Sequence, residues 1–231
     1  MKFKEVFSLF LDAIYPPRCL FCGTVISPGE KLCELCEQEN PVIHQSRWIL
    51  LPSPYQNEKI QCKVIYHYKN GVKEAILDFK FHDKPENSVF FAEKLNESIV
   101  ETYNTLHIDF VTVVPISRNR RKERRYNQSE LLAKQIVKQT DLIYVPCLEK
   151  KKENLEQHKL SAKDRKENVF DVYKCVNREI VKGKTVLLID DIVTTGYTLA
   201  ECAKTLYEAG VKKVVCAAIA TSVVEDSDFD H

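Results

Sequence analysis

Hydrophobic and polar residues follow two periods along most of this chain. Continuous apolar runs rich in β-branched residues at 108–116, 185–191 and 212–221 predict buried strands. The segment 61–68 alternates and is rich in β-forming residues, which predicts a further strand. Elsewhere apolar residues recur at three- and four-residue steps, which is typical of helices. The helices are expected at 71–81, 88–103, 127–140 and 198–210, and a short strand at 142–146.

Strands that alternate with helices predict an α/β fold with a parallel sheet. We expect this twisted, mainly parallel sheet, flanked by helices, over residues 61–224. Residues 1–45 are expected to hold a short amphipathic helix followed by a cysteine-rich module. Three prolines and little periodicity over 41–59 predict a linker at 46–60, and residues 225–231 form an acidic tail.

Composition narrows the class of protein. The chain has 231 residues, of which 44% are hydrophobic and 29% charged, as in soluble globular proteins. A net charge of +1 gives no general argument for nucleic acid or for an acidic membrane. No apolar run approaches the roughly 18–20 residues that cross a bilayer, and the N-terminal stretch lacks the features of a signal peptide. We therefore expect a cytoplasmic protein without membrane insertion.

Four of the nine cysteines form a regular array. Cys19, Cys22, Cys33 and Cys36 follow a C-x₂-C-x₁₀-C-x₂-C spacing, with a plausible turn at Pro28-Gly29 between the pairs. Four thiolates suit tetrahedral Zn²⁺ in a closed, structural site. Buried thiols or a redox pair are the alternative. The scattered positions of the other five cysteines favour a reducing compartment over a disulfide framework.

The stretch VLLIDDIVTTGYT, residues 186–198, has the composition of a ligand site. Asp190 and Asp191 close an apolar strand, and the hydroxyl-rich turn after them opens a helix whose first N–H groups attract anions. Carboxylates would repel a phosphate, so we expect them to face sugar hydroxyls or Mg²⁺ on the same ligand. The alternative is an ordinary strand–turn–helix unit with an exposed acidic pair.

This stretch resembles the signature of type I phosphoribosyltransferases, which bind phosphoribosyl pyrophosphate (PRPP). The resemblance implies that Asp190 and Asp191 are catalytic and contact the ribose hydroxyls. It also implies that the 5′-phosphate is held by Thr194, Thr195, Gly196, Tyr197 and Thr198. The loop after the first core strand contacts the pyrophosphate in these enzymes, and here that loop contains Pro115, Ile116, Ser117 and Arg118.

Further motifs narrow the resemblance. The paired Cys-x-x-Cys motifs, VVPISRNRRKERRYNQSELLAK and NLEQHKLSAKDRKENVF occur together with the signature, as in the ComF/ComFC competence-associated proteins. The resemblance extends from about Tyr15 to Thr221. Arg125 replaces a glycine that is usual in this family, which puts the local geometry in question. Lys80 also matches a family position, but the sequence offers no physical argument for its role.

The almost wholly polar segment 149–168 occupies the place of a mobile loop that covers PRPP in the resembling enzymes. The resemblance places Gln157, Ser161, Arg165 and Asn168 near the ligand in such a lid. A disordered polar linker is the alternative interpretation of the segment.

The leading hypothesis is Mg²⁺-dependent PRPP binding by a phosphoribosyltransferase-like protein that acts in DNA uptake, with an unidentified acceptor. A second hypothesis is a competence protein that handles single-stranded DNA, in which PRPP is regulatory or vestigial. Phosphate contacts from Arg120, Arg121 and Arg124 would serve that role, although a solvated basic face explains the same residues. A PRPP sensor that controls a partner is the third hypothesis. Other competence proteins and a second copy of the chain are the expected protein partners.

Overall fold

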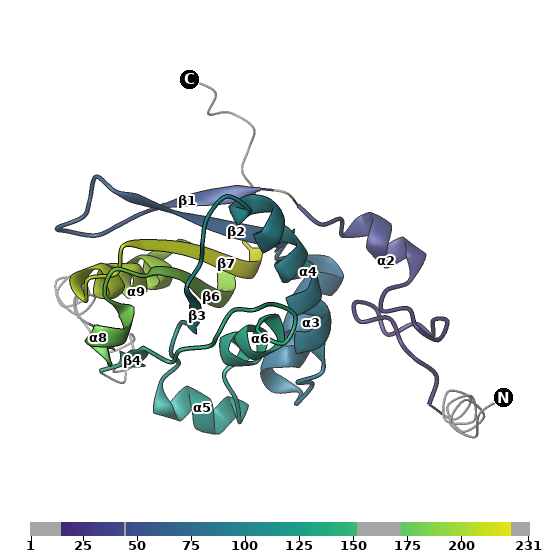
Figure 1. Cartoon of the computed structure of the whole chain (residues 1–231). Helices are drawn as coiled ribbons and strands as arrows, with labels where there is room; N and C mark the ends of the chain where they lie inside the picture. The colour runs from purple at the N-terminus through teal and green to yellow at the C-terminus, as the bar shows by residue number, and fades with distance from the viewer. Residues whose placement is uncertain (1–14, 44, 152–171, 223–231) are drawn as a thin grey trace.

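The computed structural model describes residues 15–43, 45–151 and 172–222. Its centre is a five-stranded sheet in the order β1-β2-β7-β6-β3 (Figure 1). Strands β2, β7, β6 and β3 run parallel, and β1 pairs antiparallel with β2 at one edge. The prediction of a twisted, mainly parallel α/β sheet is confirmed. The bounds are β1 Ser46–Leu50, β2 Lys59–His67, β3 Phe110–Val113, β6 Thr185–Val193 and β7 Lys213–Thr221.

Helices cover both faces of the sheet. Successive strand residues point to opposite sides, so strands that are apolar throughout have two faces to bury. In β6, Leu187 and Ile189 pack into the cluster that contains residues of α3, α4 and α6. Val186 and Leu188 of the same strand pack into the cluster that contains α9. These helices span Asn70–Phe81 (α3), Asn87–Tyr103 (α4), Gln128–Ile136 (α6) and Tyr197–Glu208 (α9).

The connections place a topological switch point between β3 and β6. These two strands are parallel neighbours with Val113 opposite Ile189. The chain leaves β3 towards α6 on one face of the sheet and leaves β6 towards α9 on the other. In open α/β sheets, ligands bind outside the carboxyl ends of the strands at such a point. The fold therefore predicts a ligand site among the residues that follow Val113 and Ile189.

The expected linker at 46–60 is wrong for residues 46–50, which form β1, and for residues 59–60, which begin β2. A short edge strand needs only half of its side chains buried, and in β1 only Ile49 is fully buried. The weak periodicity of the segment and its neighbouring prolines concealed this strand. Beyond β1, the chain turns through residues 51–58 and returns as β2.

Smaller elements complete the described chain. The predicted strand at 142–146 is reduced to one parallel bridge between Tyr144 and Val111, beside β3. The basic run after β3 is a helix rather than a loop. The remaining elements are α2 Glu34–Glu39, α5 Arg118–Arg124, α8 Arg178–Val181 and the antiparallel pair β4 Leu148–Lys150 and β5 Tyr173–Cys175.

Several predictions lie outside the described residues: the N-terminal helix at 1–14, the acidic tail at 225–231 and the lid residues Gln157, Ser161, Arg165 and Asn168. Within the described ranges, no helix combines the length and the apolar character that a membrane crossing needs.

Candidate functional site

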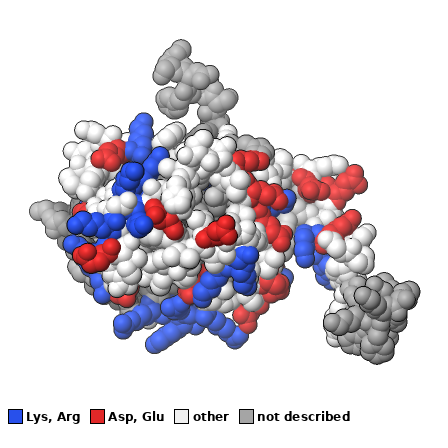
Figure 2. All heavy atoms as spheres, viewed as in Figure 1, with Lys and Arg blue, Asp and Glu red and all other residues white. Residues whose placement is uncertain are grey.

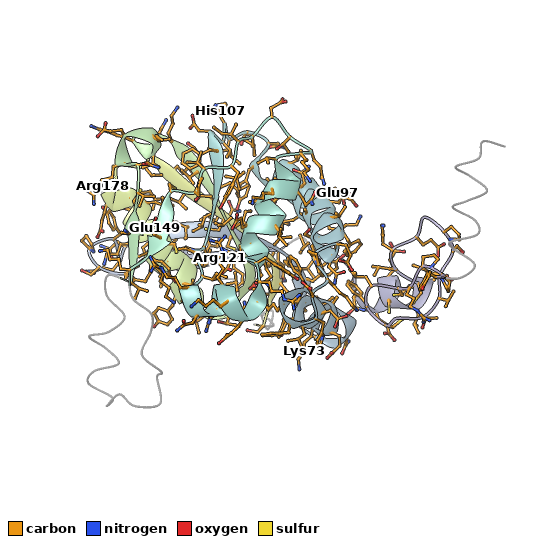
Figure 3. All side chains as sticks on the ribbon, turned by 90° about the horizontal axis from the view of Figure 1, so that it is seen from below. Lys73, Glu97, His107, Arg121, Glu149 and Arg178 are labelled. Atoms are coloured by element: carbon orange, nitrogen blue, oxygen red, sulfur yellow. The ribbon has the colours of Figure 1, made fainter. Side chains whose placement is uncertain are left out.

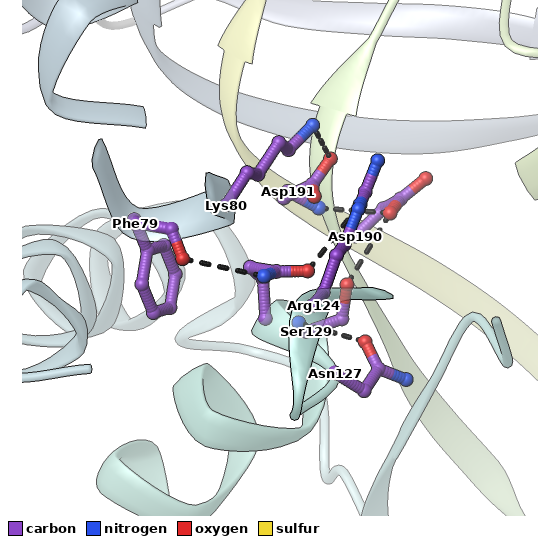
Figure 4. Close-up of polar contacts among 8 residues, drawn as sticks. Phe79, Lys80, Arg124, Asn127, Ser129, Asp190 and Asp191 are labelled. Carbon is purple, nitrogen blue, oxygen red and sulfur yellow. Dashed lines mark hydrogen bonds and ion pairs between the residues drawn. The ribbon is translucent and has the colours of Figure 1, made fainter. Parts of the chain in front are cut away.

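The two aspartates lie at the carboxyl end of β6, beside the carboxyl end of β3 (Figure 4). The N–H of Val114 donates to the carbonyl of Ile189 at 3.0 Å, so the chain after β3 is tied to the residue before Asp190. Asn127, the N-cap residue of α6, donates from Nδ2 to the Val114 carbonyl at 3.1 Å. The site is thus assembled from β3, β6 and the start of α6.

Asp190 is held by its own backbone and by α6. Its Oδ1 accepts from the Asp191 N–H at 2.8 Å and from the Ser129 hydroxyl at 3.3 Å. Burial, with a smaller contribution from the neighbouring Asp191 carboxylate, raises the pKa of Asp190 to about 7. Two adjacent carboxylates in this setting favour a ligand that brings positive charge or hydrogen-bond donors.

Asp191 forms an ion pair with Lys80. The Lys80 Nζ lies 2.9 Å from Asp191 Oδ1, and the two side chains are only 12% and 13% exposed. Lys80 lies in the last turn of α3, so this helix contributes a positive charge to the acidic pair. The pairing gives Lys80 the physical role that sequence analysis could not supply.

In each of the two carboxylates, one oxygen makes all the contacts with described residues. Oδ1 of Asp190 and Oδ1 of Asp191 accept all the hydrogen bonds and ion-pair contacts named above. The second oxygen of each group, Oδ2, therefore keeps its acceptor capacity for a hydroxyl or a cation. Oxygen ligands of this type suit Mg²⁺.

The turn after the aspartates leads directly into α9. Its N-cap residue, Gly196, has φ 83° and makes no side-chain capping bond, so the first N–H groups of a 12-residue helix lack a side-chain partner. The flanking residues of the turn, Thr194, Thr195, Tyr197 and Thr198, are exposed. Unpartnered N–H groups at the positive end of a helix dipole form a site for an anion.

Strand β1 supports this turn, and sequence analysis missed both residues involved. Arg47 donates from Nη1 to the Thr194 carbonyl at 2.7 Å and to Thr221 Oγ1 at 3.0 Å. A Cβ at Gly196 would lie 3.0 Å from Cγ2 of Ile49, so the turn rests closely on the strand. The short apolar run Trp48-Ile49-Leu50 was the available signal, and it is too short to identify a strand alone.

The predicted pyrophosphate loop, Pro115 to Arg118, follows β3 and leads into α5. Ser117 is the N-cap of α5, and its hydroxyl accepts from the Arg120 N–H at 3.3 Å. The loop lines one wall of a cavity of about 1040 Å³ that α6, β4 and β5 complete. Arg121 and Glu149, labelled in Figure 3, line the same cavity from α5 and β4.

The three arginines predicted to contact DNA differ in their surroundings, although Lys and Arg gather around α5 (Figure 2). Arg120 is exposed. Arg121 pairs with Glu130 of α6 at 2.6 Å. Arg124 is half-buried, lies 5.1 Å from the Phe81 ring centroid and donates to Gln128 Oε1 at 3.4 Å. Arg120 is therefore the best placed of the three for a partner in solution.

Arg125 occupies a position that favours glycine. It ends α5 with φ 62° and ψ −25°, in the left-handed region. Its guanidinium pairs with Asp83 at 2.6 Å on the surface. The chain therefore keeps the geometry in which the resembling family usually has glycine, at a cost in backbone strain.

The four cysteines of the array meet in space. The sulfurs of Cys19, Cys22, Cys33 and Cys36 all lie within 4.8 Å of one another. The Cys22–Cys33 sulfur distance is 3.7 Å, close to the roughly 3.8 Å edge of a tetrahedron with Zn–S bonds of about 2.3 Å. Hydrogen bonding with Thr24 lowers the pKa of the Cys22 thiol to about 6, which favours the thiolate that binds metal. This donor set fits a structural zinc ion.

Comparison with known families agrees with both parts of the structure. The model of the phosphoribosyl transferase domain matches residues 91–226, and that of the double zinc ribbon domain matches residues 10–62. Fold and sequence together define a phosphoribosyltransferase-type domain with an N-terminal zinc module. The chain belongs to the phosphoribosyl transferase domain family, and the names of its relatives together with the zinc ribbon match support the ComF family within it.

Three curated relatives illustrate the family. Competence protein F of Haemophilus influenzae is 27% identical over 203 residues, covering 86% of this chain and 82% of that protein. Competence protein ComFC of Bacillus subtilis is 29% identical over 150 residues, covering 65% of this chain and 59% of that protein. DNA utilization protein YhgH of Escherichia coli is 25% identical over 205 residues, covering 85% and 86%.

The chain is also similar to solved structures, at lower sequence identity. The allosteric regulatory enzyme of purine biosynthesis is 21% identical, with a TM-score of 0.43, over 62% of this chain and 29% of that one. Adenine phosphoribosyltransferase from Saccharomyces cerevisiae is 14% identical, with a TM-score of 0.39, over 76% of this chain and 83% of that one.

Proposed function

We propose that this protein binds PRPP with Mg²⁺ at the switch point between β3 and β6 and acts as a phosphoribosyltransferase-like protein in DNA uptake. The observation that carries the proposal is the pairing of Asp190 and Asp191 with the uncapped start of α9 at one sheet edge. An acidic pair beside an anion site suits a phosphorylated sugar, because each group meets a different part of the ligand.

In this arrangement, the 5′-phosphate accepts hydrogen bonds from the N–H groups at the start of α9 and from the Thr194–Thr198 hydroxyls. Oδ2 of Asp190 and Oδ2 of Asp191 accept from the ribose hydroxyls. Their Oδ1 atoms stay bonded to Ser129 and Lys80, which fixes the direction of both carboxylates. Binding energy at the phosphate then positions the ribose C1 atom.

The pyrophosphate end of the ligand lies against the loop from Pro115 to Arg118 and extends into the adjoining cavity. Arg118, which is exposed at the start of α5, supplies a positive charge and two donors to this group. Mg²⁺ supplies neutralisation of the pyrophosphate charge when it is bound. Arg118 thus favours departure of pyrophosphate.

If the protein transfers the phosphoribosyl group, an acceptor forms a bond to C1 while the bond from C1 to pyrophosphate breaks. Asp190 and Asp191 stabilise positive charge on the ribose ring during this exchange. The acceptor stays unidentified. Binding without release of pyrophosphate would instead favour the PRPP sensor.

Calorimetric titration of PRPP with Mg²⁺ into the zinc-loaded protein tests the proposal. We expect wild-type binding and a loss of about a hundredfold or more in Asp190→Asn/Asp191→Asn, because two acceptors of charge-assisted bonds change together. Asp141→Asn, which removes one exposed carboxylate elsewhere, serves as the control and should bind as the wild type does. Equal affinity of the double variant and the wild type would place PRPP at another site.

A second function is favoured by the exposed basic residues of α5 and by relatives named for competence and DNA utilization. The protein would handle single-stranded DNA along α5, with PRPP binding in a regulatory role. Arg120 and Lys122 are both exposed there. Contacts of lysine and arginine with phosphates make binding depend on salt.

Binding of single-stranded DNA across a salt series tests this second function. Arg120→Ala/Lys122→Ala should lower the slope of log K against log salt by about 1.4, if each residue meets one phosphate. Lys212→Ala/Lys213→Ala is the matched control, because both lysines are exposed at the start of β7, whereas α5 follows the end of β3. An unchanged slope in the α5 variant, or equal losses in both variants, would exclude α5 as the DNA contact.

A further inference from the structure

Phe21 belongs to the zinc module by sequence and to the phosphoribosyltransferase-type domain by packing. It lies between the ligands Cys19 and Cys22, yet it is only 5% exposed. Its ring meets Tyr66 of β2 edge-on at 5.8 Å and Phe90 of α4 edge-on at 6.0 Å. Figure 1 shows the module beside α3 and α4 at one side of the sheet. Phe21 thus packs the zinc module against the phosphoribosyltransferase-type domain.

The recess for Phe21 is completed by the first turn of α3. A Cβ at Gly71 would lie 2.5 Å from Cβ of Phe21 and 3.1 Å from its carbonyl oxygen. Contact this close leaves no room for a side chain, so α3 and the cysteine loop meet backbone to backbone. Any shift of Phe21 is therefore transmitted to the start of α3.

The other end of α3 carries Lys80, the ion-pair partner of Asp191. The carbonyl of the preceding residue, Phe79, accepts from the Tyr126 hydroxyl at 2.7 Å and from Gln128 Nε2 at 3.2 Å. Helix α3 therefore contacts the zinc module at its start. At its end it is bonded through Phe79 to the start of α6 (Figure 4). Lys80 directly follows Phe79, so it lies at the end of α3 that these bonds hold.

The zinc module has little apolar material with which to hold its own shape. Among its described residues, 15–43, the buried apolar side chains other than cysteine are Phe21 and Ile26. A segment this poor in apolar core depends on metal binding for its folding free energy. Zinc binding by the four cysteines therefore determines whether the module is folded and holds Phe21 in its recess.

We infer that Phe21 is a positioning residue through which the zinc module fixes α3, and with it the Lys80–Asp191 pair. PRPP affinity then depends on zinc, although the cysteines lie outside the PRPP site. The part of the inference that concerns PRPP rests on the proposed function. The part that concerns α3 does not, and it can be tested without ligand.

Hydrogen exchange in the full-length, zinc-loaded protein tests the ligand-independent part. Phe21→Ala should raise exchange of the α3 amides by on the order of tenfold and leave those of α9, on the other sheet face, unchanged. Leu35→Ala is the control, since Leu35 belongs to the same module but is 62% exposed. Phe21→Leu keeps most of the apolar volume and guards against a variant that fails to fold. Its α3 exchange should lie between that of Phe21→Ala and that of Leu35→Ala. Equal increases in α3 and α9, or none in α3, would overturn the inference.

Zinc removal and PRPP titration test the second part. A chelator that binds Zn²⁺ but little Mg²⁺ should lower PRPP affinity on the order of tenfold in the wild type and much less in Phe21→Ala. In a double-mutant cycle, Phe21→Ala should add little to the effect of Lys80→Ala, because both act through one contact. Additive effects would overturn the link to Lys80. If the wild type binds no PRPP, the proposed function fails, and the exchange experiment still decides the role of Phe21.

Discussion

Arg125 carries a backbone conformation that glycine adopts without strain. Its φ of 62° ends α5, and the compensating ion pair with Asp83 is exposed and therefore weak. We expect Arg125→Gly to raise the free energy of unfolding by about 0.5–1 kcal/mol. Lys122→Gly, within the same helix, should lower it by about 1 kcal/mol. Urea unfolding of both variants measures the two changes. Destabilisation by Arg125→Gly would mean that the ion pair outweighs the strain.

Asp190 links the ligand site to the pH dependence of stability. Its pKa is about 7 in the folded protein against an ordinary value of 3.8, because burial disfavours the carboxylate. The folded state therefore holds this proton more tightly than the unfolded state does. The stability that this proton contributes is complete below about pH 4 and is lost as the pH rises through 7.

Asp190→Asn removes this titration while keeping an oxygen acceptor. The wild type should lose stability between pH 5 and pH 8, and the variant should not. The difference in free energy of unfolding between variant and wild type should therefore shift by roughly 2 kcal/mol in favour of the variant over this range. Denaturant unfolding across that range measures the difference, and Asp141→Asn, at an exposed position, should show none. A difference that stays flat with pH would contradict the raised pKa.

At the scale of elements, β1 connects the edge of the sheet to the phosphate turn. Arg47 bonds the Thr194 carbonyl and the Thr221 hydroxyl, at the ends of β6 and β7. We expect Arg47→Ala to weaken PRPP binding on the order of tenfold, since the turn loses a charge-assisted bond worth about 1.5–3 kcal/mol. Titration monitored through Trp48, the single tryptophan, measures the change, with Lys59→Ala on β2 as the control. Equal affinity in the two variants would show that β1 does not order the turn.

The elements differ in how far the sequence could predict them. Strands β6 and β7 are buried on both faces, so their apolar runs were unmistakable. β1 buries only Ile49 fully, and α5 buries no side chain, so neither carries a strong hydrophobic period. Both are held in place by partners distant in sequence, which a local pattern does not record.

At the scale of the whole molecule, the position of the site was predictable from the sequence, but the distant residues that hold the site in place were not. Asp190 and Asp191 and the turn after them follow a recognisable strand, so their position at the sheet edge was predictable. Lys80 is 111 residues from Asp191, and Arg47 is 147 from Thr194. Only the folded chain reveals such pairs. The same holds for Phe21, whose burial depends on β2, α3 and α4 together.

A crystal structure of the zinc-loaded protein with PRPP and Mg²⁺ tests the central claim most directly. The account predicts the 5′-phosphate on the N–H groups at the start of α9, the ribose hydroxyls on Asp190 and Asp191, and the pyrophosphate against residues 115–118. Zinc should occupy the four cysteines in the same crystal. PRPP bound away from the carboxyl ends of β3 and β6, with this edge empty, would contradict the account.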